Sequence, residues 1–181
     1  MTLTYNLTEE DYLNHQLFMA SLSDRVKAQR RRSRLIWFIV FFSLALLSYQ
    51  RKDSFLTYYF LGFAIFYILF HPLYSRWLYK RHYKKNVAET YKNRFDKNST
   101  ITIDSEQIHD IDETSETKIS TSEIEKTYET SKYIFLKLKS GLTLIIPKFK
   151  VQNLDLVIQE LKAIANMRQA DYIEMLNWHW R

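Results

Sequence analysis

The five histidines are the side chains of this sequence best suited to bind a metal ion or to move a proton near neutral pH. They are His15, His71, His82, His109 and His179. No two of them stand four positions apart, so the helical histidine pair of a zinc protease is missing. His109 lies beside four acidic residues, Asp110, Asp112, Glu113 and Glu116, and these could form a metal or acid–base site. An acidic loop without a spaced set of ligands is usually only solvated, and we favour that interpretation.

Motifs for nucleophiles and phosphate binding are also missing from the sequence. The 181 residues include no cysteine and only two glycines. This excludes cysteine nucleophiles, thiolate zinc sites and disulfides, and it leaves no glycine-rich loop for a phosphate. GxSxG, Walker and GxGxxG patterns do not occur. We therefore expect a protein that is not an enzyme and that has no catalytic residue, metal ligand or cofactor.

Positive charge is the second chemical feature of the sequence. The net charge is +6, and basic residues gather on the outer sides of two apolar runs. The basic cluster nearest to the runs is Arg30, Arg31, Arg32, Arg34, Arg76, Lys80, Arg81, Lys84 and Lys85. Such a cluster attracts the phosphates of nucleic acid or of anionic lipid. The neighbouring apolar runs favour anionic lipid headgroups, and we expect no nucleic-acid partner.

The two apolar runs cover residues 35–49 and 55–74. About 20 apolar residues in a helix cross the hydrocarbon core of a bilayer, which is about 30 Å thick. We therefore predict a transmembrane hairpin over residues 33–75, with spans at 33–50 and 55–74. The alternative is a pair of core helices in a soluble bundle, but such helices usually keep a polar stripe, and these runs have none.

The distribution of Lys and Arg predicts the orientation of the hairpin. Only Arg51 and Lys52 lie between the runs, whereas both outer flanks are rich in basic residues. Because basic loops stay in the cytoplasm, we expect both termini to be cytoplasmic. The polar residues before the first run do not resemble a cleaved signal peptide.

The flanks of the hairpin show helical periodicity. Residues 1–32 combine a short strand pattern at 2–7 with a basic amphipathic helix after Thr8, whose apolar positions are Leu13, Leu17, Phe18, Leu22 and Val26. Residues 76–97 form a second such helix, with Tyr79, Tyr83, Val87, Tyr91 and Phe95 on one stripe. We expect the two helices to pack together as a stalk. The alternative is that each basic stripe lies flat on anionic lipid.

Residues 98–168 are predicted to form a separate β-rich domain. Apolar and polar residues alternate at 101–103, 134–138 and 142–146, with a turn at Ser140-Gly141, while 107–112, 118–121 and 124–130 are weaker strand candidates. After Asn153, the expected N-cap, a helix follows with one apolar face, Leu154, Val157, Ile158, Leu161 and Ile164. We predict that this face packs on Ile134, Leu136, Leu138, Leu142, Leu144 and Ile146. The strand at 2–7 has no local partner, so it should join this sheet and give about seven strands in a closed or nearly closed barrel.

Residues 169–181 are predicted to be an aromatic C-terminal tail. The candidate contact residues are Tyr172, Leu176, Trp178 and Trp180. The tail could extend a second helix, and its apolar side chains should be covered by the membrane interface or by another protein. The alternative, that it folds back onto the stalk helices, stays equally open.

The order of several short motifs carries a further indication. An LTEEDY segment at 7–12 precedes the apolar runs, and the strand-rich part that follows includes IEK at 124–126, YIFL at 133–136 and IPK at 146–148. Over roughly residues 3–165 the chain resembles the YcxB-like family of small bacterial membrane proteins. Similar members often have a Trp near the start of the strand that runs into Ile124, where this chain has Ser120-Thr121-Ser122. The resemblance implies a pleckstrin-homology-like domain, a bent sheet or small barrel capped by one helix, and it implies no established activity.

These patterns together predict an α+β membrane protein, with a two-helix transmembrane hairpin and a cytoplasmic β-rich, pleckstrin-homology-like domain capped by a C-terminal helix. Its predicted location is the bacterial cytoplasmic (inner) membrane. We expect a non-enzymatic, membrane-anchored adaptor or regulatory protein. Its partners would be the anionic headgroups of the bilayer and a protein, either another one or a second copy of this chain. The alternative is an immunity-type inner-membrane protein that neutralises a secreted toxin, which a neighbouring toxin gene would favour.

Overall fold

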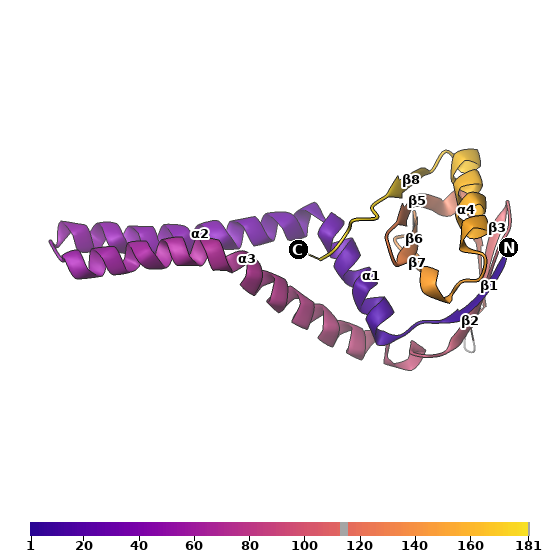
Figure 1. Ribbon diagram of the computed structural model, residues 1–181, viewed down its shortest axis with the longest axis horizontal. Coiled ribbons are helices and arrows are strands. Elements are labelled where there is room, and N and C mark those ends of the chain that lie inside the picture. Colours follow the sequence, from indigo (N-terminus) through magenta and orange to yellow (C-terminus); the bar gives the residue numbers. More distant parts are fainter. Residues whose placement is uncertain (113–115, 181) are drawn as a thin grey trace. The chain divides into compact units, whose positions relative to one another are not determined.

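The computed structural model describes residues 1–112 and 116–180 and has an α+β architecture. The chain forms two compact units (Figure 1). The strand unit comprises Met1–His15 and Asn86–His179, and the helical unit comprises Gln16–Lys85 together with Trp180. The helical unit therefore interrupts the strand unit in sequence.

The helices of the first half of the chain are α1 (Glu9–Leu22), α2 (Asp24–Gln50) and α3 (Ser54–Thr90). Each apolar run is continuous with its basic flank, since α2 and α3 extend through both. The amphipathic helix expected from Thr8 to Val26 is instead broken at Ser23, whose side chain accepts a hydrogen bond from the Val26 backbone N–H as the N-cap of α2. The second amphipathic helix, predicted over residues 76–97, also ends earlier. Helix α3 ends at Thr90, and a short 3₁₀ turn, η1 (Lys92–Arg94), follows.

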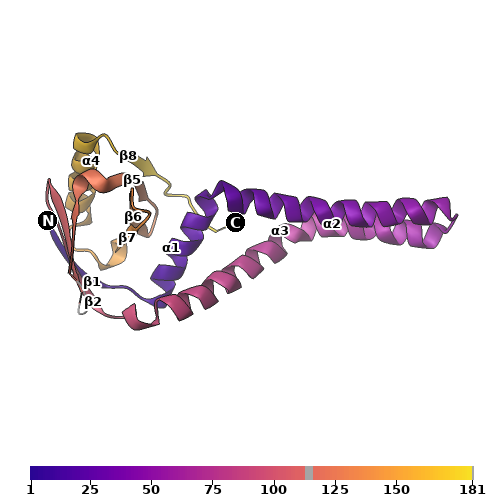
Figure 2. The ribbon, with the colours of Figure 1, turned by 180° about the vertical axis from the view of Figure 1, so that it is seen from behind.

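Helices α2 and α3 run side by side as a hairpin (Figures 1 and 2). Aromatic rings join them, with the ring centroid of Phe41 6.0 Å from those of both Phe63 and Tyr67. The side chains buried along the hairpin are small ones, such as Ala45, Ser48 and Ala64, while most large apolar side chains of both helices are exposed. Both helices are long and apolar enough to span a membrane, with mean hydropathies of 1.4 and 1.5 over their most apolar windows.

The first sheet of the strand unit has the order β1-β2-β3-β4, with all neighbours antiparallel. Its strands are β1 (Thr2–Asn6), β2 (Asn98–Ile103), β3 (Gln107–Asp112) and β4 (Glu116–Ser120). Thr2 lies opposite Thr102 and Asn6 opposite Asn98, which confirms that the N-terminal strand joins the sheet. The whole segment from Leu7 to Lys97, including the hairpin, is thus inserted between two paired strands.

The second sheet has the order β7-β6-β5-β8. Its strands are β5 (Ile124–Glu129), β6 (Tyr133–Leu138), β7 (Thr143–Pro147) and β8 (Asp171–Glu174), and the short 3₁₀ turn η2 (Thr121–Glu123) leads from β4 into β5. Strand β8 pairs in parallel with β5, so the start of the predicted tail belongs to the sheet and is not a helix. The described residues thus form eight strands in two four-stranded sheets, where the sequence predicted about seven strands in one closed or nearly closed barrel.

The connection between β6 and β7 is a tight hairpin, as predicted from Ser140-Gly141. The Gly141 N–H donates to the Leu138 carbonyl over 2.9 Å, and the Leu138 N–H donates to the Leu142 carbonyl over 2.9 Å. Gly141 has φ of 88°, a conformation that costs glycine little and a residue with Cβ much more. The strands end at Leu138 and resume at Thr143, so the turn is longer than the two residues predicted.

The core of the strand unit forms where α4 (Leu154–Arg168) lies along β5 and β8 (Figure 2). It contains Val157, Leu161 and Ile164 of α4 with Ile134, Leu136, Leu138 and Ile146 of the sheet, and Leu144, Leu154 and Ile158 pack at its margin. The predicted packing is therefore confirmed, except that Leu142 is 63% exposed because it lies in the turn. Asn153 precedes α4 but has a left-handed backbone, and its side chain makes no cap hydrogen bond, contrary to the expectation.

Candidate functional site

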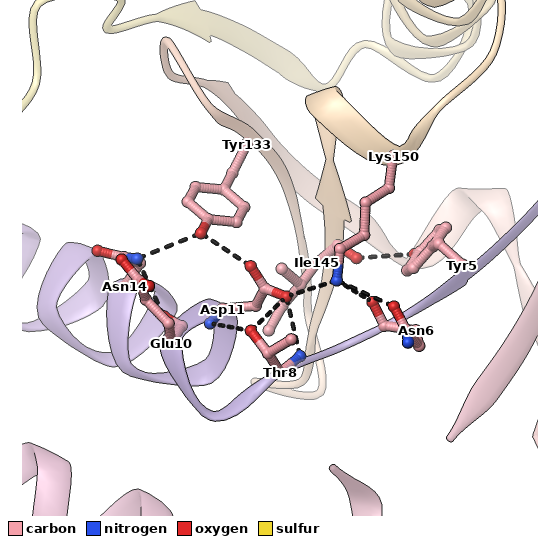
Figure 3. Close-up of polar contacts among 9 residues, drawn as sticks. All are labelled: Tyr5, Asn6, Thr8, Glu10, Asp11, Asn14, Tyr133, Ile145 and Lys150. Carbon is pink, nitrogen blue, oxygen red and sulfur yellow. Dashed lines mark hydrogen bonds and ion pairs between the residues drawn. The ribbon is translucent and has the colours of Figure 1, made fainter. Parts of the chain in front are cut away.

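A buried carboxylate, Asp11 in the first turn of α1, is the centre of a polar anchor in the strand unit (Figure 3). Asp11 is 2% exposed and accepts hydrogen bonds from the Thr8 N–H and hydroxyl, both over 2.9 Å. The Tyr133 hydroxyl of β6 donates to it over 2.9 Å, and the Lys150 ammonium reaches it at 3.2 Å. Lys150, in the 3₁₀ turn η3 (Lys148–Lys150), also donates to the Asn6 carbonyl over 2.8 Å. The anchor thus joins the end of β1, the start of α1 and the second sheet.

The electrostatics of the anchor favour fixed charges over proton transfer. Burial opposes ionisation of Asp11, but the hydrogen bonds from Thr8, Tyr133 and Lys150 outweigh it and lower its pKa. Burial and the neighbouring Asp11 raise the pKa of Tyr133 well above its usual value. At neutral pH Asp11 is therefore ionised and Tyr133 protonated, and both shifts move away from pH 7. This arrangement suits a structural tie better than an acid–base pair.

A second buried carboxylate, Glu129 at the end of β5, holds strand β8. Glu129 accepts a hydrogen bond from the Tyr172 hydroxyl of β8 over 2.6 Å and forms an ion pair with Lys148 at 2.6 Å. Burial opposes ionisation, but the contacts with Lys148 and Tyr172 outweigh it and lower the pKa of Glu129. Tyr172, predicted to be a contact residue of a free tail, is thus part of the strand unit.

The histidines do not form a common site in the structure. Among the described residues, no group of three or more His, Cys, Asp or Glu side chains is placed to hold a metal ion. The His109 imidazole contacts the Glu116 carboxylate at 2.7 Å across neighbouring strands, and Glu113 lies outside the described residues. His15 is buried beside Phe135, with 5.6 Å between ring centroids, and its two ring nitrogens have no hydrogen-bond partner.

The end of β4, the start of β3 and Arg168 of α4 border an open cavity of about 460 Å³. It is lined by Glu106, Gln107, Lys118, Ile119, Ser120 and Arg168. The Thr121 N–H donates to the Glu106 carbonyl over 2.8 Å, so the alternation of an antiparallel ladder directs the backbone N–H groups of Lys118 and Ser120 away from β3. Among residues 1–112 and 116–180, no strand pairs with the outer side of β4, which is therefore an open edge of the first sheet.

The predicted basic cluster lies on both helices of the helical unit. Arg31, Arg32, Arg76, Lys80, Arg81, Lys84 and Lys85 are exposed, whereas Arg30 and Arg34 are partly buried. The Arg30 guanidinium lies over the rings of Tyr79 and Trp180, 5.8 and 5.3 Å from their centroids. The sequence pattern did not distinguish Arg30 from its neighbours, since the contact with Trp180 joins residues 150 positions apart.

The candidate contact residues of the tail have separate environments. Tyr172 lies in β8, Leu176 is exposed and Trp178 is partly buried. Trp180 is 7% exposed within the helical unit, where its indole N–H donates to the Arg76 carbonyl over 3.2 Å. Of the alternatives left open by the sequence, packing on the helices is therefore the one that holds for Trp180. Arg181 lies outside the described residues.

Comparison with known proteins adds no family to this description. No known protein-family model matches the chain, and a search of curated proteins likewise finds no match. The resemblance to the YcxB-like family therefore stays a prediction that rests on the motifs quoted above.

Proposed function

We propose that this protein is a non-enzymatic, membrane-anchored adaptor or regulatory protein. In this proposal α2 and α3 span the bacterial cytoplasmic membrane as a hairpin. The strand unit is a cytoplasmic pleckstrin-homology-like domain of a YcxB-like protein, and it binds a protein partner.

The observation that carries the proposal is the pairing of β1 with β2. These strands lie before and after the apolar hairpin in sequence, yet they pair over Thr2–Asn6 and Asn98–Thr102. A hairpin inserted in a bilayer must then return its chain to the side where it started. Basic residues flank both outer ends of the hairpin, and basic flanks favour the cytoplasmic side.

The strand order supports a pleckstrin-homology-like domain. Strands β1 to β4 follow one another in the first sheet, β5 to β7 follow one another in the second, and α4 comes next in the chain and packs on the core. The resemblance implied a bent sheet or small barrel capped by one helix, and two sheets with α4 on their core are consistent with that, while β8 is an addition. The unpaired edge of β4 supports a binding role, because a peptide in extended conformation can add a strand to such an edge.

Photocrosslinking in cells tests the binding role. A photoreactive phenylalanine at Lys118 of the full-length protein should give a discrete cross-linked product, and the same group at Leu156, exposed on α4, should not. Ser120→Pro should abolish the product, because it removes an outward N–H while fitting the Ser120 φ of −64°. A product unaffected by Ser120→Pro would contradict binding at this edge.

The membrane anchor is tested separately by alkaline carbonate extraction of membranes from the same cells. The full-length protein should remain in the membrane pellet. Its recovery in the soluble fraction would contradict the anchor.

A further inference from the structure

The surroundings of Arg30 in the helical unit differ from those of an ordinary surface arginine. Its guanidinium lies against the rings of Tyr79 and Trp180 and donates to the Ser75 hydroxyl over 3.4 Å. Ser75 in turn donates to the Pro72 carbonyl over 3.1 Å. These contacts restrict the arginine to one region at the base of the hairpin, where it is already ordered before any ligand binds.

Two more arginines lie near Arg30 on the facing helices. Arg34 follows Arg30 by four positions, one helical turn, in α2. Arg76 lies in α3, and its backbone carbonyl accepts the hydrogen bond of the Trp180 indole whose ring Arg30 covers. Acidic residues are rare in both helices. Between Asp24 and Glu89 the only acidic residue is Asp53, which lies in the connection at the other end of the hairpin. Asp24 itself contacts Lys27 at 3.3 Å.

The position of these arginines indicates which anion would neutralise them. Arg34 immediately precedes the first apolar run, and Arg76 follows the second by one residue. In a membrane-inserted hairpin these are the positions at the level of the headgroup phosphates. Trp180 is buried beside them, and its N–H donates to the Arg76 carbonyl.

We propose that Arg30, Arg34 and Arg76 form a specific site for the phosphodiester headgroup of one anionic glycerophospholipid, with Trp180 and Tyr79 holding Arg30 in place. This inference rests on the proposed membrane anchor and adds a defined lipid partner to it. The guanidinium groups donate paired hydrogen bonds to the phosphate oxygens. The site differs from diffuse attraction because Arg30 is held by the rings of Tyr79 and Trp180, and Arg30 and Arg34 are partly buried, whereas Arg31 and Arg32 are exposed.

The matched variants are Arg34→Gln/Arg76→Gln in the site and Arg31→Gln/Arg32→Gln outside it. Each pair removes two positive charges from the same end of the hairpin, so a diffuse field would weaken by a similar amount in both. Full-length protein in dodecyl maltoside is mixed with phosphatidylglycerol, cardiolipin or phosphatidylcholine, and native mass spectrometry counts the lipids retained. We expect one retained phosphatidylglycerol or cardiolipin molecule on the wild type and on Arg31→Gln/Arg32→Gln. Affinity should fall at least about tenfold for Arg34→Gln/Arg76→Gln.

Several results would overturn the site. Equal losses in the two double variants would mean diffuse attraction only, and equal retention of phosphatidylcholine would remove the role of charge. Displacement of the lipid by millimolar inorganic phosphate would assign the arginines to a free anion. Displacement by a duplex oligonucleotide would assign them to nucleic acid.

Circular dichroism checks the fold of each variant, and Arg76→Gln alone, at an exposed side chain, replaces the double variant if that variant is unfolded. Carbonate extraction of the wild type separates the two proposals, since its release from membranes would contradict the anchor itself.

Discussion

The two units of this protein place their large apolar side chains in opposite ways. In the strand unit, Ile134, Leu136 and Ile146 are fully buried, and the edge strand β4 is largely exposed and polar. In the helical unit, Ala45 and Ala64 are buried, while large residues along both helices, such as Ile39 and Phe55, are exposed. A chain that buries small residues and exposes large ones suits an apolar solvent. This difference is what the proposed membrane anchor predicts, because in that proposal only the helical unit faces an apolar solvent.

Polar groups differ between the units as well. The strand unit buries two carboxylates, Asp11 and Glu129, and gives each a lysine and a tyrosine as partners. The helical unit contains many basic residues and almost no acidic ones. The two buried carboxylates of the strand unit thus have partners within that unit, whereas the charge of the helical unit is mostly of one sign.

The largest loss of stability is expected when a charge is placed in the core of the strand unit. Leu161 of α4 is 1% exposed, so Leu161→Asp buries a carboxylate without a partner and should cost about 4 kcal/mol or more, enough to unfold the unit. Leu156→Asp, at a side chain 58% exposed on the same helix, should change the stability little. Urea unfolding in detergent, followed by near-ultraviolet circular dichroism, measures both. A cooperative transition retained in Leu161→Asp would show that α4 does not cover the core.

The polar anchor should give the next largest effect. Asp11→Ala leaves the Tyr133 hydroxyl and the Lys150 ammonium without their acceptor and should lower the free energy of unfolding by about 2–3 kcal/mol. Asp171→Ala, which removes an exposed ion pair with Lys126, should change the free energy of unfolding far less. Adding Lys150→Met to Asp11→Ala should cost less than the sum of the two single changes. Strict additivity in that cycle would contradict a coupled anchor.

A pH dependence distinguishes His15 from the exposed histidines. Burial lowers the pKa of His15 from 6.5 to about 4. Between these values the unfolded chain binds a proton that the folded chain does not, so stability should fall as the pH drops from 6.5 toward 4. The slope should reach about 1.4 kcal/mol per pH unit. Urea unfolding between pH 4.5 and 7 should show the slope in the wild type and in His82→Leu, at an exposed position, and a smaller slope in His15→Leu. An unchanged slope in His15→Leu would mean that other groups cause it.

The smallest effect is expected at the surface pair of Lys162 and Glu174. The two side chains are about half exposed and 2.6 Å apart, and Lys162 also lies over the Tyr172 ring. Lys162→Gln should leave the free energy of unfolding nearly unchanged, because exposed ion pairs contribute little. A large loss would show that β8 is held mainly from its exposed side and not by Glu129.

The sequence was informative wherever periodicity carries the signal. The apolar runs predicted both long helices, and the alternation at 134–138 and the face of Leu161 predicted the core, because burial repeats with the period of each element. The strand at 2–7 was assigned to the sheet because it lacked a local partner. Leu142 was misplaced, since its alternation with Leu144 continues into the turn.

The polar features depend on contacts between distant residues and could not be predicted in this way. From the sequence, Asp11 was only an acidic residue in the first turn of a predicted helix. No local sequence pattern connects it with Tyr133 or Lys150. Four residues at Asp171–Glu174 are too few to show a strand period, so β8 was missed. The contacts of Arg30 include the Trp180 ring. From the sequence, we could not decide which surface covers the C-terminal tail that contains Trp180.

The central claim is that the hairpin crosses a membrane and that both of its ends return to the strand unit on the cytoplasmic side. Because the native chain has no cysteine, Ser54→Cys at the start of α3 and Ser131→Cys in the exposed turn between β5 and β6 can each carry a single thiol. The measurement is labelling by a membrane-impermeant maleimide in intact spheroplasts, with detergent-treated spheroplasts as the control in which both positions react. We expect labelling at position 54 and none at position 131 until the membrane is dissolved. Labelling of position 131 in intact spheroplasts, or protection of position 54, would contradict it.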